Sequence, residues 1–504
     1  MRRLGILDLG SNTARLVVYN IERGNWFRLV DQMRERVRLG EGLGSSGRLL
    51  PSAMDRTEAA VALFAEYARN SELDQLEALA TSAARDAVNG EEFLRRIEPY
   101  GLDLRVLEGE DEARTGVRAV ANSFDLRDAW VVDLGGGSAQ VSRMKARRFA
   151  FGGAYPLGAV RLTEAYFHSD PPAIEEVEAL EQKIDQVLEE SLGLMRGDEA
   201  SIVAMGGTVR NLARAVQKLE RYPLADRIHG YFLRRDALEA LTDRLLSTPL
   251  IERQALPGIR ADRADIVIAG ALVFRRLMRR SGRDGLWISG YGLREGELFR
   301  HFLEPPHLLA DLRAFSVRNL LAHYVGSDRR TETVKRLASR LFSGLSTVHG
   351  LGDREAELLR AAAELQDIGW AVNYYRRDQH SAHLVASAPL NGFSHREQAL
   401  LSCVVRFYRK GEPSLGSLAA CCRQEDARLL SLLVGCLRVA SHLDRTRSGR
   451  VRDVRVVCAE REIKVAIEAG SDPSLELRGL DQEAALLASS LGRRLEFSVA
   501  GGSA

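Results

Sequence analysis

Long apolar runs are missing from this chain of 504 residues. The longest, residues 266–274, is far shorter than the roughly 20 residues that a bilayer-spanning helix needs and lies in mid-chain. The opening Met1-Arg2-Arg3 runs directly into a strand-like segment, so no signal peptide is expected. We therefore expect a cytoplasmic protein that has no membrane partner.

Cysteine is scarce, and an excess of one charge is lacking. The five cysteines lie between Cys403 and Cys458 without a CxxC pair, which excludes a zinc site of the usual spacing and favours reduced thiols.

The formal net charge is only +2. Arginine clusters occur at Arg275, Arg276, Arg279 and Arg280, and at Arg445, Arg447, Arg450 and Arg452. They are either solvated helix faces or a groove for a long polyanion; without aromatic-rich motifs, no nucleic-acid partner is expected.

What the sequence does contain is a repeated strand–turn–strand unit. The strand-like Leu4-Gly5-Ile6-Leu7 leads into Asp8-Leu9-Gly10-Ser11-Asn12-Thr13, and Trp130-Val131-Val132 leads into Asp133-Leu134-Gly135-Gly136-Gly137-Ser138. A second strand-like run follows each turn. The pattern predicts two β-hairpins that belong to two related halves.

The two turns have the chemistry of phosphate loops. Glycine lets backbone N–H groups approach phosphate oxygens, and hydroxyl and amide side chains add donors. We expect phosphate binding by Gly10, Ser11, Asn12, Thr13, Gly135, Gly136, Gly137 and Ser138; the alternative is a purely structural duplication. Neither turn is a P-loop, because the lysine is missing and strand leads to strand, and no GxGxxG turn opens a helix.

Element patterns divide the chain into four expected domains. Helices are predicted at 52–68, 111–122, from Asp170 onward and at 264–280, and short strands at 106–107 and 201–204. After Pro305-Pro306 the pattern is helical to about residue 448. It then changes to strands at 451–457, 462–467 and 495–499 around a helix at 482–492. The expected domains are 1–125, 126–304, 305–448 and 449–504.

Five motifs in order resemble one family. They are Asp8 to Arg15, Thr81-Ser82-Ala83-Ala84-Arg85-Asp86-Ala87, Leu107-Glu108-Gly109-Glu110-Asp111-Glu112-Ala113, Asp133 to Gln140, and Ser289 to Gly296. The set is similar to that of the exopolyphosphatase / guanosine pentaphosphate phosphohydrolase family. This resemblance implies an α/β N-terminal half with two ribonuclease-H-like domains of the actin/sugar-kinase superfamily, an all-α histidine–aspartate-like domain and a small C-terminal α+β unit.

The resemblance also implies residue roles. Glu112 would orient or deprotonate the attacking water, although its local sequence equally suits a glutamate in a first helical turn. Arg85 would bind phosphate, and Asp133, with Asp8 and Gln140, would hold Mg²⁺. Further phosphate-binding residues would be Arg15, Gly206, Gly207 and Thr208.

One position departs from the family pattern. The second loop usually ends in a glutamate that helps to hold the metal, and this chain has Gln140. An amide offers a carbonyl oxygen without charge, so we expect weaker Mg²⁺ binding.

The segment 310–448 resembles a histidine–aspartate phosphohydrolase domain, but the metal-binding His-Asp pair is replaced by Gln366-Asp367. We therefore expect no binuclear metal site there. Its basic residues Arg376, Arg377, Arg406, Arg409 and Lys410 are either solvated helix ends or part of a polyanion track.

The expected function is hydrolysis of terminal phosphates from inorganic polyphosphate, and the expected assembly is a homodimer. Hydrolysis of guanosine pentaphosphate (pppGpp) uses the same residues and remains an alternative. Two further alternatives are an ATP-dependent sugar kinase and a non-catalytic sensor of polyphosphate or nucleotides.

Overall fold

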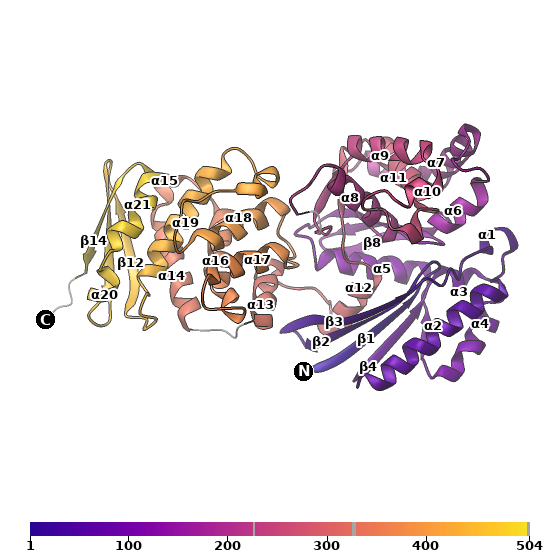
Figure 1. Cartoon of the computed structure of the whole chain (residues 1–504), viewed down its shortest axis with the longest axis horizontal. Helices are drawn as coiled ribbons and strands as arrows, with labels where there is room; N and C mark the ends of the chain where they lie inside the picture. The colour runs from indigo at the N-terminus through magenta and orange to yellow at the C-terminus, as the bar shows by residue number, and fades with distance from the viewer. Residues whose placement is uncertain (225–226, 325–328, 501–504) are drawn as a thin grey trace. The chain divides into compact units, whose positions relative to one another are not determined.

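The computed structural model describes residues 1–224, 227–324 and 329–500. The chain forms two compact units, Met1–Leu312 and Arg313–Ala504 (Figure 1). The N-terminal unit contains two mixed sheets and the C-terminal unit a third. No helix among the described residues has the length and apolar character needed to cross a membrane.

Two sheets make up the framework of the N-terminal unit. The first has the order β3-β2-β1-β4-β5, with β1 at Arg2–Leu9, β2 at Ala14–Glu22, β3 at Trp26–Glu35, β4 at Gln75–Ala80 and β5 at Leu104–Val106. The second has the order β8-β7-β6-β9-β11-β10, with β6 at Ala129–Leu134, β7 at Ala139–Lys145, β8 at Arg148–Tyr155, β9 at Ser201–Met205, β10 at Tyr231–Arg234 and β11 at Gly285–Ile288.

The helices of this unit follow the strands in alternation. They are α1 (Leu43–Ser46), α2 (Pro51–Asn70), α3 (Ser82–Asp86), α4 (Gly90–Ile97), α5 (Gly109–Ala121), α6 (Ala159–Tyr166), α7 (Ile174–Arg196), α8 (Gly207–Leu219), α9 (Arg235–Ser247), α10 (Leu250–Arg253), α11 (Val267–Ser281) and α12 (Leu293–Phe302). The predicted helices are found, with shifted ends. The helix expected from Asp170 begins at Ile174, because the Glu176 side chain accepts from the backbone N–H of Ala173 at its start.

The duplication predicted from the two turns is present in the sheets. In each sheet the first three strands run antiparallel, and the first then pairs in parallel with a later strand. The registers also match, since Asp8 faces Arg15 across the first hairpin and Asp133 faces Gln140 across the second. One supersecondary plan is therefore used twice.

Each sheet packs its own apolar core. Leu7, Leu16 and Val18 of the first sheet contact Val61 and Phe64 of α2. Figure 1 shows α2 and α4 together on one side of this sheet. The second sheet packs against the long helices α7, α8 and α11. Helices α5 and α12 pack against one another, α5 also contacting the second sheet and α12 the first. The hairpin turns are thus held by rigid elements on both sides.

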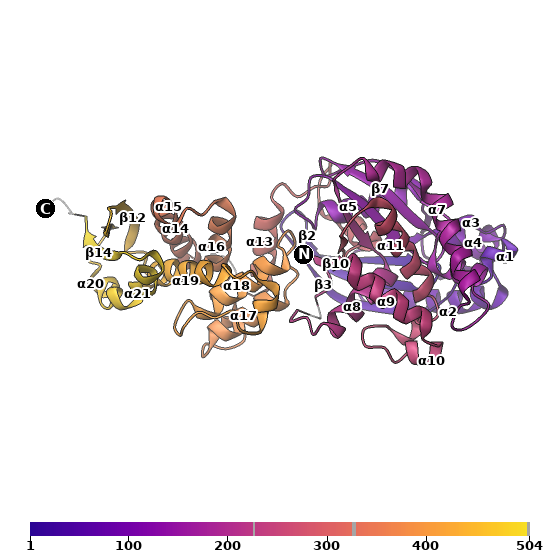
Figure 2. The same cartoon turned by 90° about the horizontal axis from the view of Figure 1, so that it is seen from above.

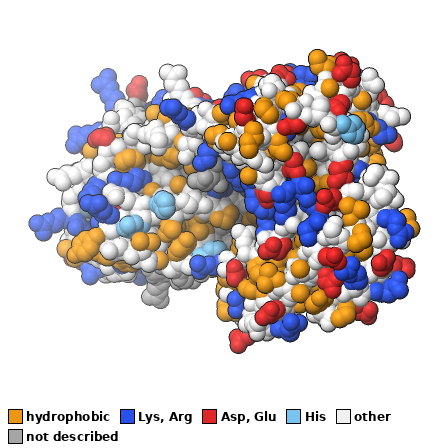
Figure 3. Space-filling view, turned by 45° about the vertical axis from the view of Figure 1, so that its right-hand side comes forward, with side chains coloured by type: hydrophobic (Ala, Val, Ile, Leu, Met, Phe, Trp, Pro, Cys, Tyr) orange, Lys and Arg blue, Asp and Glu red, His pale blue; other side chains and the backbone are white. Residues whose placement is uncertain are grey.

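Most of one predicted arginine cluster is occupied by ion pairs. On α11, Arg275 pairs with Glu181 at 2.7 Å and Arg279 with Glu239 at 2.8 Å, while Arg276 pairs with Asp185. Figure 3 shows acidic and basic side chains interspersed on the face that it draws. Such pairing favours a structural role for this cluster over a polyanion groove.

The C-terminal unit is helical and ends in a small sheet. Its helices are α13 (Leu312–Tyr324), α14 (Arg329–Gly344), α15 (Ser346–His349), α16 (Asp353–Leu365), α17 (Arg377–Ser387), α18 (His395–Phe407), α19 (Asp426–His442), α20 (Ser474–Leu477) and α21 (Leu480–Leu491). The sheet order is β12-β13-β14, with β12 at Val451–Cys458, β13 at Glu462–Ala469 and β14 at Arg494–Val499. Figure 2 shows α21 beside α19, and one continuous core joins the helices to the sheet.

Candidate active site

A cavity of about 150 Å³ collects most of the residues that the sequence singled out. The predicted residues that line it are Asp8, Gly10, Ser11, Asn12, Thr13, Arg15, Glu112, Asp133, Gly135, Gly136, Ser138, Gln140, Gly206 and Gly207. Segments far apart in the chain therefore meet at one place, at the turns of both hairpins.

The two hairpin turns have the same internal geometry. The Gly10 N–H donates to the Thr13 carbonyl at 3.2 Å, and the Gly135 N–H donates to the Ser138 carbonyl at 2.9 Å. Each turn begins with an aspartate at a strand end. Two equivalent loops thus present backbone N–H groups and hydroxyls to the same space.

The turns approach each other closely, which explains the glycines of the second turn. A Cβ atom on Gly137 would lie 2.6 Å from both the Ser11 and Ser82 hydroxyl oxygens. A Cβ on Gly136 would lie 3.2 Å from the Asn12 backbone nitrogen. Side chains at these positions would push the loops apart, so the glycines set the width of the site.

Glu112 reaches the cavity from the first turn of α5. Its Oε2 lies 3.5 Å from Nη1 of Arg85, which also donates to the Leu107 carbonyl at 2.8 Å. Burial raises the pKa of Glu112 to about 8, helped by the charge of Asp133 and opposed by Arg85. The structure is compatible with both interpretations of this residue, as a glutamate of a first helical turn and as a group that acts at the site, since Glu112 lies in the first turn of α5 and also lines the cavity.

Asp8 and Asp133 occupy equivalent strand ends. Burial raises the pKa of both carboxyls, that of Asp133 to about 6, and the charge of Asp8 adds to the shift of Asp133. Arg294 opposes the shift of Asp8 and lies 3.3 Å from its Oδ2. Because burial makes both carboxyls costly to ionise, a cation bound beside them would stabilise their charged forms.

Gln140 is 3% exposed and lines the same cavity. Its Nε2 donates to the Ser138 hydroxyl at 3.0 Å. With the amide nitrogen engaged in this bond, the carbonyl oxygen is the atom that remains for a cation.

Four arginines also line the cavity, and sequence reasoning identified only Arg15. Arg210 donates to the carbonyls of Ser289 (3.0 Å) and Tyr291 (3.2 Å), and Arg263 donates to the Thr13 hydroxyl at 3.3 Å. Burial lowers the pKa of Arg15 and of Arg263 to about 10, and neighbouring arginines add to both shifts. Clustered buried cations of this kind are stabilised by an anionic ligand.

The sequence marks the three arginines that were not predicted, Arg210, Arg263 and Arg294, to different degrees. Arg210 follows the Gly206-Gly207 turn, and Arg294 follows Gly292, so both stand beside glycine elements that the sequence had indicated. No pattern marks Arg263, which precedes α11 and is brought in by tertiary packing.

Three predicted residues do not line the cavity. Arg85 lies behind Glu112, Gly137 lies where the turns meet, and Thr208 is buried in α8 at 2% exposure. The neighbouring Gly206 has φ +102°, and a Cβ there would lie 2.2 Å from the Leu134 carbonyl oxygen. Only glycine fits that position, because an L side chain disfavours this backbone conformation and would collide with the strand.

Asn12 supplies a further sign of a polar ligand. Its side-chain oxygen and nitrogen are buried, and neither has a hydrogen-bond partner among the described residues. Because burying an amide unpaired is costly, a ligand with both acceptor and donor atoms would stabilise it.

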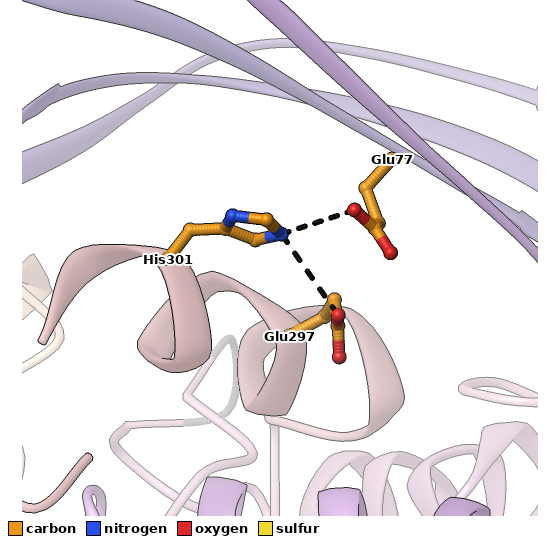
Figure 4. A group of neighbouring side chains, drawn as sticks. All are labelled: Glu77, Glu297 and His301. Carbon is orange, nitrogen blue, oxygen red and sulfur yellow. Dashed lines mark ion pairs between the residues drawn. The ribbon is translucent and has the colours of Figure 1, made fainter. Parts of the chain in front are cut away.

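One acidic cluster outside the cavity has a different explanation. Figure 4 shows the His301 ring directed at Glu77 and Glu297, with Nε2 at 3.2 Å from the first and 3.9 Å from the second. Arg105 lies 3.2 Å from Glu77 and 3.0 Å from Glu297, and Arg300 lies 2.9 Å from Glu77. The cluster is therefore an ion-pair network whose carboxylates are already neutralised.

In the C-terminal unit, Asp367 is engaged by protein groups. Its Oδ1 accepts from Arg377 Nε at 2.7 Å and from the Tyr408 hydroxyl at 2.6 Å. These two contacts leave Asp367 paired with groups of the protein itself.

Comparison with known proteins identifies the family. The family profile described as Ppx/GppA phosphatase family matches residues 17–304, and the profile of domain III of Ppx/GppA phosphatase matches residues 312–492. The chain belongs to the Ppx/GppA phosphatase family. It is accordingly an enzyme, a phosphatase.

Relatives and solved structures cover about three fifths of the chain. Exopolyphosphatase 1 of Mycobacterium tuberculosis and that of Mycobacterium bovis are each 33% identical over 307 residues, which cover 59% of this chain and 88% of the relative. The crystal structure of the Aquifex aeolicus Ppx/GppA family member shares 29% identity, covers 59% of this chain and 96% of its own, and has a TM-score of 0.50.

An exopolyphosphatase structure from Cytophaga hutchinsonii (23% identity, TM-score 0.56) covers 60% of this chain and 98% of its own, and shows the fold alone. The expected actin-like fold type of the N-terminal half is thereby confirmed. The histidine–aspartate character of the helical segment and the division into four domains stay predictions.

Proposed function

We propose that this phosphatase is an exopolyphosphatase that releases orthophosphate from the ends of inorganic polyphosphate. The observation that supports this most is the meeting of both glycine loops, two aspartates and Glu112 on one cavity. Relatives named exopolyphosphatase are 33% identical to this chain over 307 residues. The cavity is polar, arginine-lined and small, which suits a terminal phosphoryl group better than a bulky apolar substrate.

The loops and arginines would position the terminal phosphate. Phosphoryl transfer depends mainly on positioning and on stabilising charge. Backbone N–H groups of the two turns, the hydroxyls of Ser11 and Ser138, and Arg15 are the donors that surround the oxygens. Arg210 and Arg294 carry further positive charge beside the aspartates.

Glu112 would act as the base. Its carboxylate accepts a proton from a water molecule as the water oxygen bonds to the terminal phosphorus and the phosphoanhydride P–O bond breaks. The leaving chain departs with the bridging oxygen, and orthophosphate is released. Arg85 holds the carboxylate from behind, acting as a positioning residue through its contacts with Glu112 and the Leu107 carbonyl.

Mg²⁺ fits the donor set. Asp8, Asp133 and Gln140 offer the oxygen ligands that Mg²⁺ prefers, and burial makes ionising either aspartate costly unless a cation is near. When bound, Mg²⁺ neutralises charge on the phosphate oxygens.

The alternative substrate, pppGpp, would use the same groups for its terminal phosphate. The sensor alternative rests on Gln140, which replaces a charged ligand by an amide. A sugar kinase would need, in addition to Glu112, a base for the acceptor hydroxyl. The other carboxylates among the described lining residues are Asp8 and Asp133, both proposed as Mg²⁺ ligands, so the lining disfavours a kinase.

One experiment separates these functions. The full chain is incubated with Mg²⁺ and either long-chain polyphosphate, pppGpp, or ATP with sugars, and released phosphate or sugar phosphate is measured. We expect the highest kcat/KM for phosphate release with polyphosphate. A higher value with pppGpp would replace the proposal by the nucleotide activity, and binding without release from any substrate would favour the sensor.

A further inference from the structure

A second cavity, of about 1010 Å³, lies wholly within the C-terminal unit. It is bounded by the segments after α16 and α18, the end of α19 and the region of α20 and α21. Its size is at the upper end of the roughly 300–1,000 Å³ typical of ligand sites. None of the groups used above for phosphate release belongs to it.

The cavity carries a strong positive charge. Six arginines line it, namely Arg377, Arg409, Arg438, Arg445, Arg447 and Arg478, and among its described lining residues the one carboxylate is Glu483. Of these, Arg377 pairs with Asp367 at 2.7 Å and Arg409 with Asp378 at 3.5 Å, so part of the charge is neutralised outside the lining. Among the lining residues the arginines still outnumber the carboxylate, which favours a ligand with several negative charges.

Arg377 supplies evidence for a ligand that is independent of the charge count. The residue is only 7% exposed, and its Nη1 is buried with no hydrogen-bond partner among the described residues. Its Nε is fixed by Asp367, which holds the guanidinium plane at the cavity wall. A buried charged donor left unpaired is destabilising, and an acceptor oxygen from a ligand would satisfy it.

The cavity wall also has a flat aromatic surface. Trp370 and Tyr374 stack with ring centroids 5.9 Å apart and an angle of 29° between their planes. The Arg447 guanidinium lies 3.8 Å from the Trp370 ring centroid, while Tyr374 is 57% exposed. An exposed stacked ring beside arginines binds a planar base well. A phosphate chain without a base has no ring that could stack on it.

We propose that this cavity binds a nucleoside triphosphate, with its base against the Tyr374–Trp370 stack and its phosphates on Arg377 and the surrounding arginines. The site is non-catalytic: the Asp367 carboxylate is engaged by Arg377 and Tyr408, and no proton or phosphoryl transfer is assigned to it. The aromatic surface distinguishes this cavity from an extension of a polyphosphate track, for which arginines alone would suffice.

Local protection of backbone amides tests the proposal. Hydrogen exchange is measured by mass spectrometry on the full-length Glu112→Gln protein, used so that the probes are not consumed, with ATP, tripolyphosphate or adenosine. We expect ATP to protect residues 370–377 and 475–483 more strongly than either other probe. Equal protection by tripolyphosphate would overturn the nucleotide assignment in favour of a phosphate chain, and no protection there by any probe would overturn the site.

Variants then assign the two parts of the ligand. Tyr374→Ala should weaken ATP binding about tenfold and leave tripolyphosphate binding unchanged, whereas Arg478→Ala should weaken both about tenfold. Arg455→Ala, at an exposed arginine of β12 outside the cavity, is the matched control and should change neither. Unaltered ATP affinity in both cavity variants would contradict the proposal, and because Tyr374 and Arg478 are exposed, the variants should fold.

Discussion

At the scale of single residues, Glu112 combines a structural and a chemical position. Replacing it by glutamine keeps the volume and the contact with Arg85 but removes the carboxylate proposed as the proton acceptor. We expect kcat for polyphosphate to fall at least about 100-fold with an unchanged circular dichroism spectrum. The matched control is Glu110→Gln, an exposed glutamate of the same helical turn. Full activity in Glu112→Gln would refute the base assignment.

The same residue predicts a pH profile. A base must be deprotonated to act, so activity is present above its pKa and lost as pH falls through it. With a pKa of about 8 for Glu112, kcat/KM should rise about tenfold per pH unit up to about pH 8 and then level off. A bound cation lowers this pKa, so raising Mg²⁺ should move the midpoint to lower pH. A profile flat from pH 6 to 9 would exclude Glu112 as the titrating group.

Gln140 predicts an effect on metal affinity. Gln140→Glu adds a third carboxylate to Asp8 and Asp133, so Mg²⁺ should bind more tightly, by about tenfold. The measurement is the Mg²⁺ concentration that gives half-maximal phosphate release. Gln182→Glu, at an exposed position of α7, controls for net charge. An unchanged titration in Gln140→Glu would remove Gln140 from the metal site.

At the scale of elements, the second glycine loop, at residues 135–138, depends on α6. Gly158 precedes this helix, and a Cβ there would lie 2.2 Å from the Gly136 carbonyl oxygen. Because that atom is backbone, Gly158→Ala must displace the loop, and we expect kcat/KM to fall about 100-fold. Gly193→Ala in α7, where a Cβ meets nothing within 4 Å, should keep activity and gain about 0.5–1 kcal/mol of stability. Equal activities would show that the loop tolerates displacement.

The sequence predicted elements well where local pattern decides. Both hairpins follow from strand patterns and glycine turns, and the register that sets Asp8 opposite Arg15 follows from the turn length. The short strands β10 and β11 were not predicted, because their four-residue runs have too little periodicity. Arg263 was missed for a related reason, since only tertiary packing brings it to Thr13.

At the scale of the whole molecule, the chain divides into two compact units with separate cores. The family profile matches residues 17–304, which lie within the first unit, and the Aquifex aeolicus relative covers 59% of this chain with 96% of its own length. We therefore expect a fragment ending at Leu312 to fold and to release phosphate from short polyphosphate. Circular dichroism and phosphate assays of the purified fragment test this. An aggregated or unfolded fragment would show that the first unit depends on the second.

The two similar hairpins have a consequence for how a ligand is oriented in the cavity. The two loops share the same hydrogen-bonded turn and the same aspartate at a strand end. The orientation of a ligand in the cavity must therefore be set by what differs between the repeats. Arg15 in one repeat corresponds to Gln140 in the other, and Glu112 approaches from α5 alone. These differences make the two sides of the cavity chemically unequal, so we expect a phosphate ligand to bind there in one orientation.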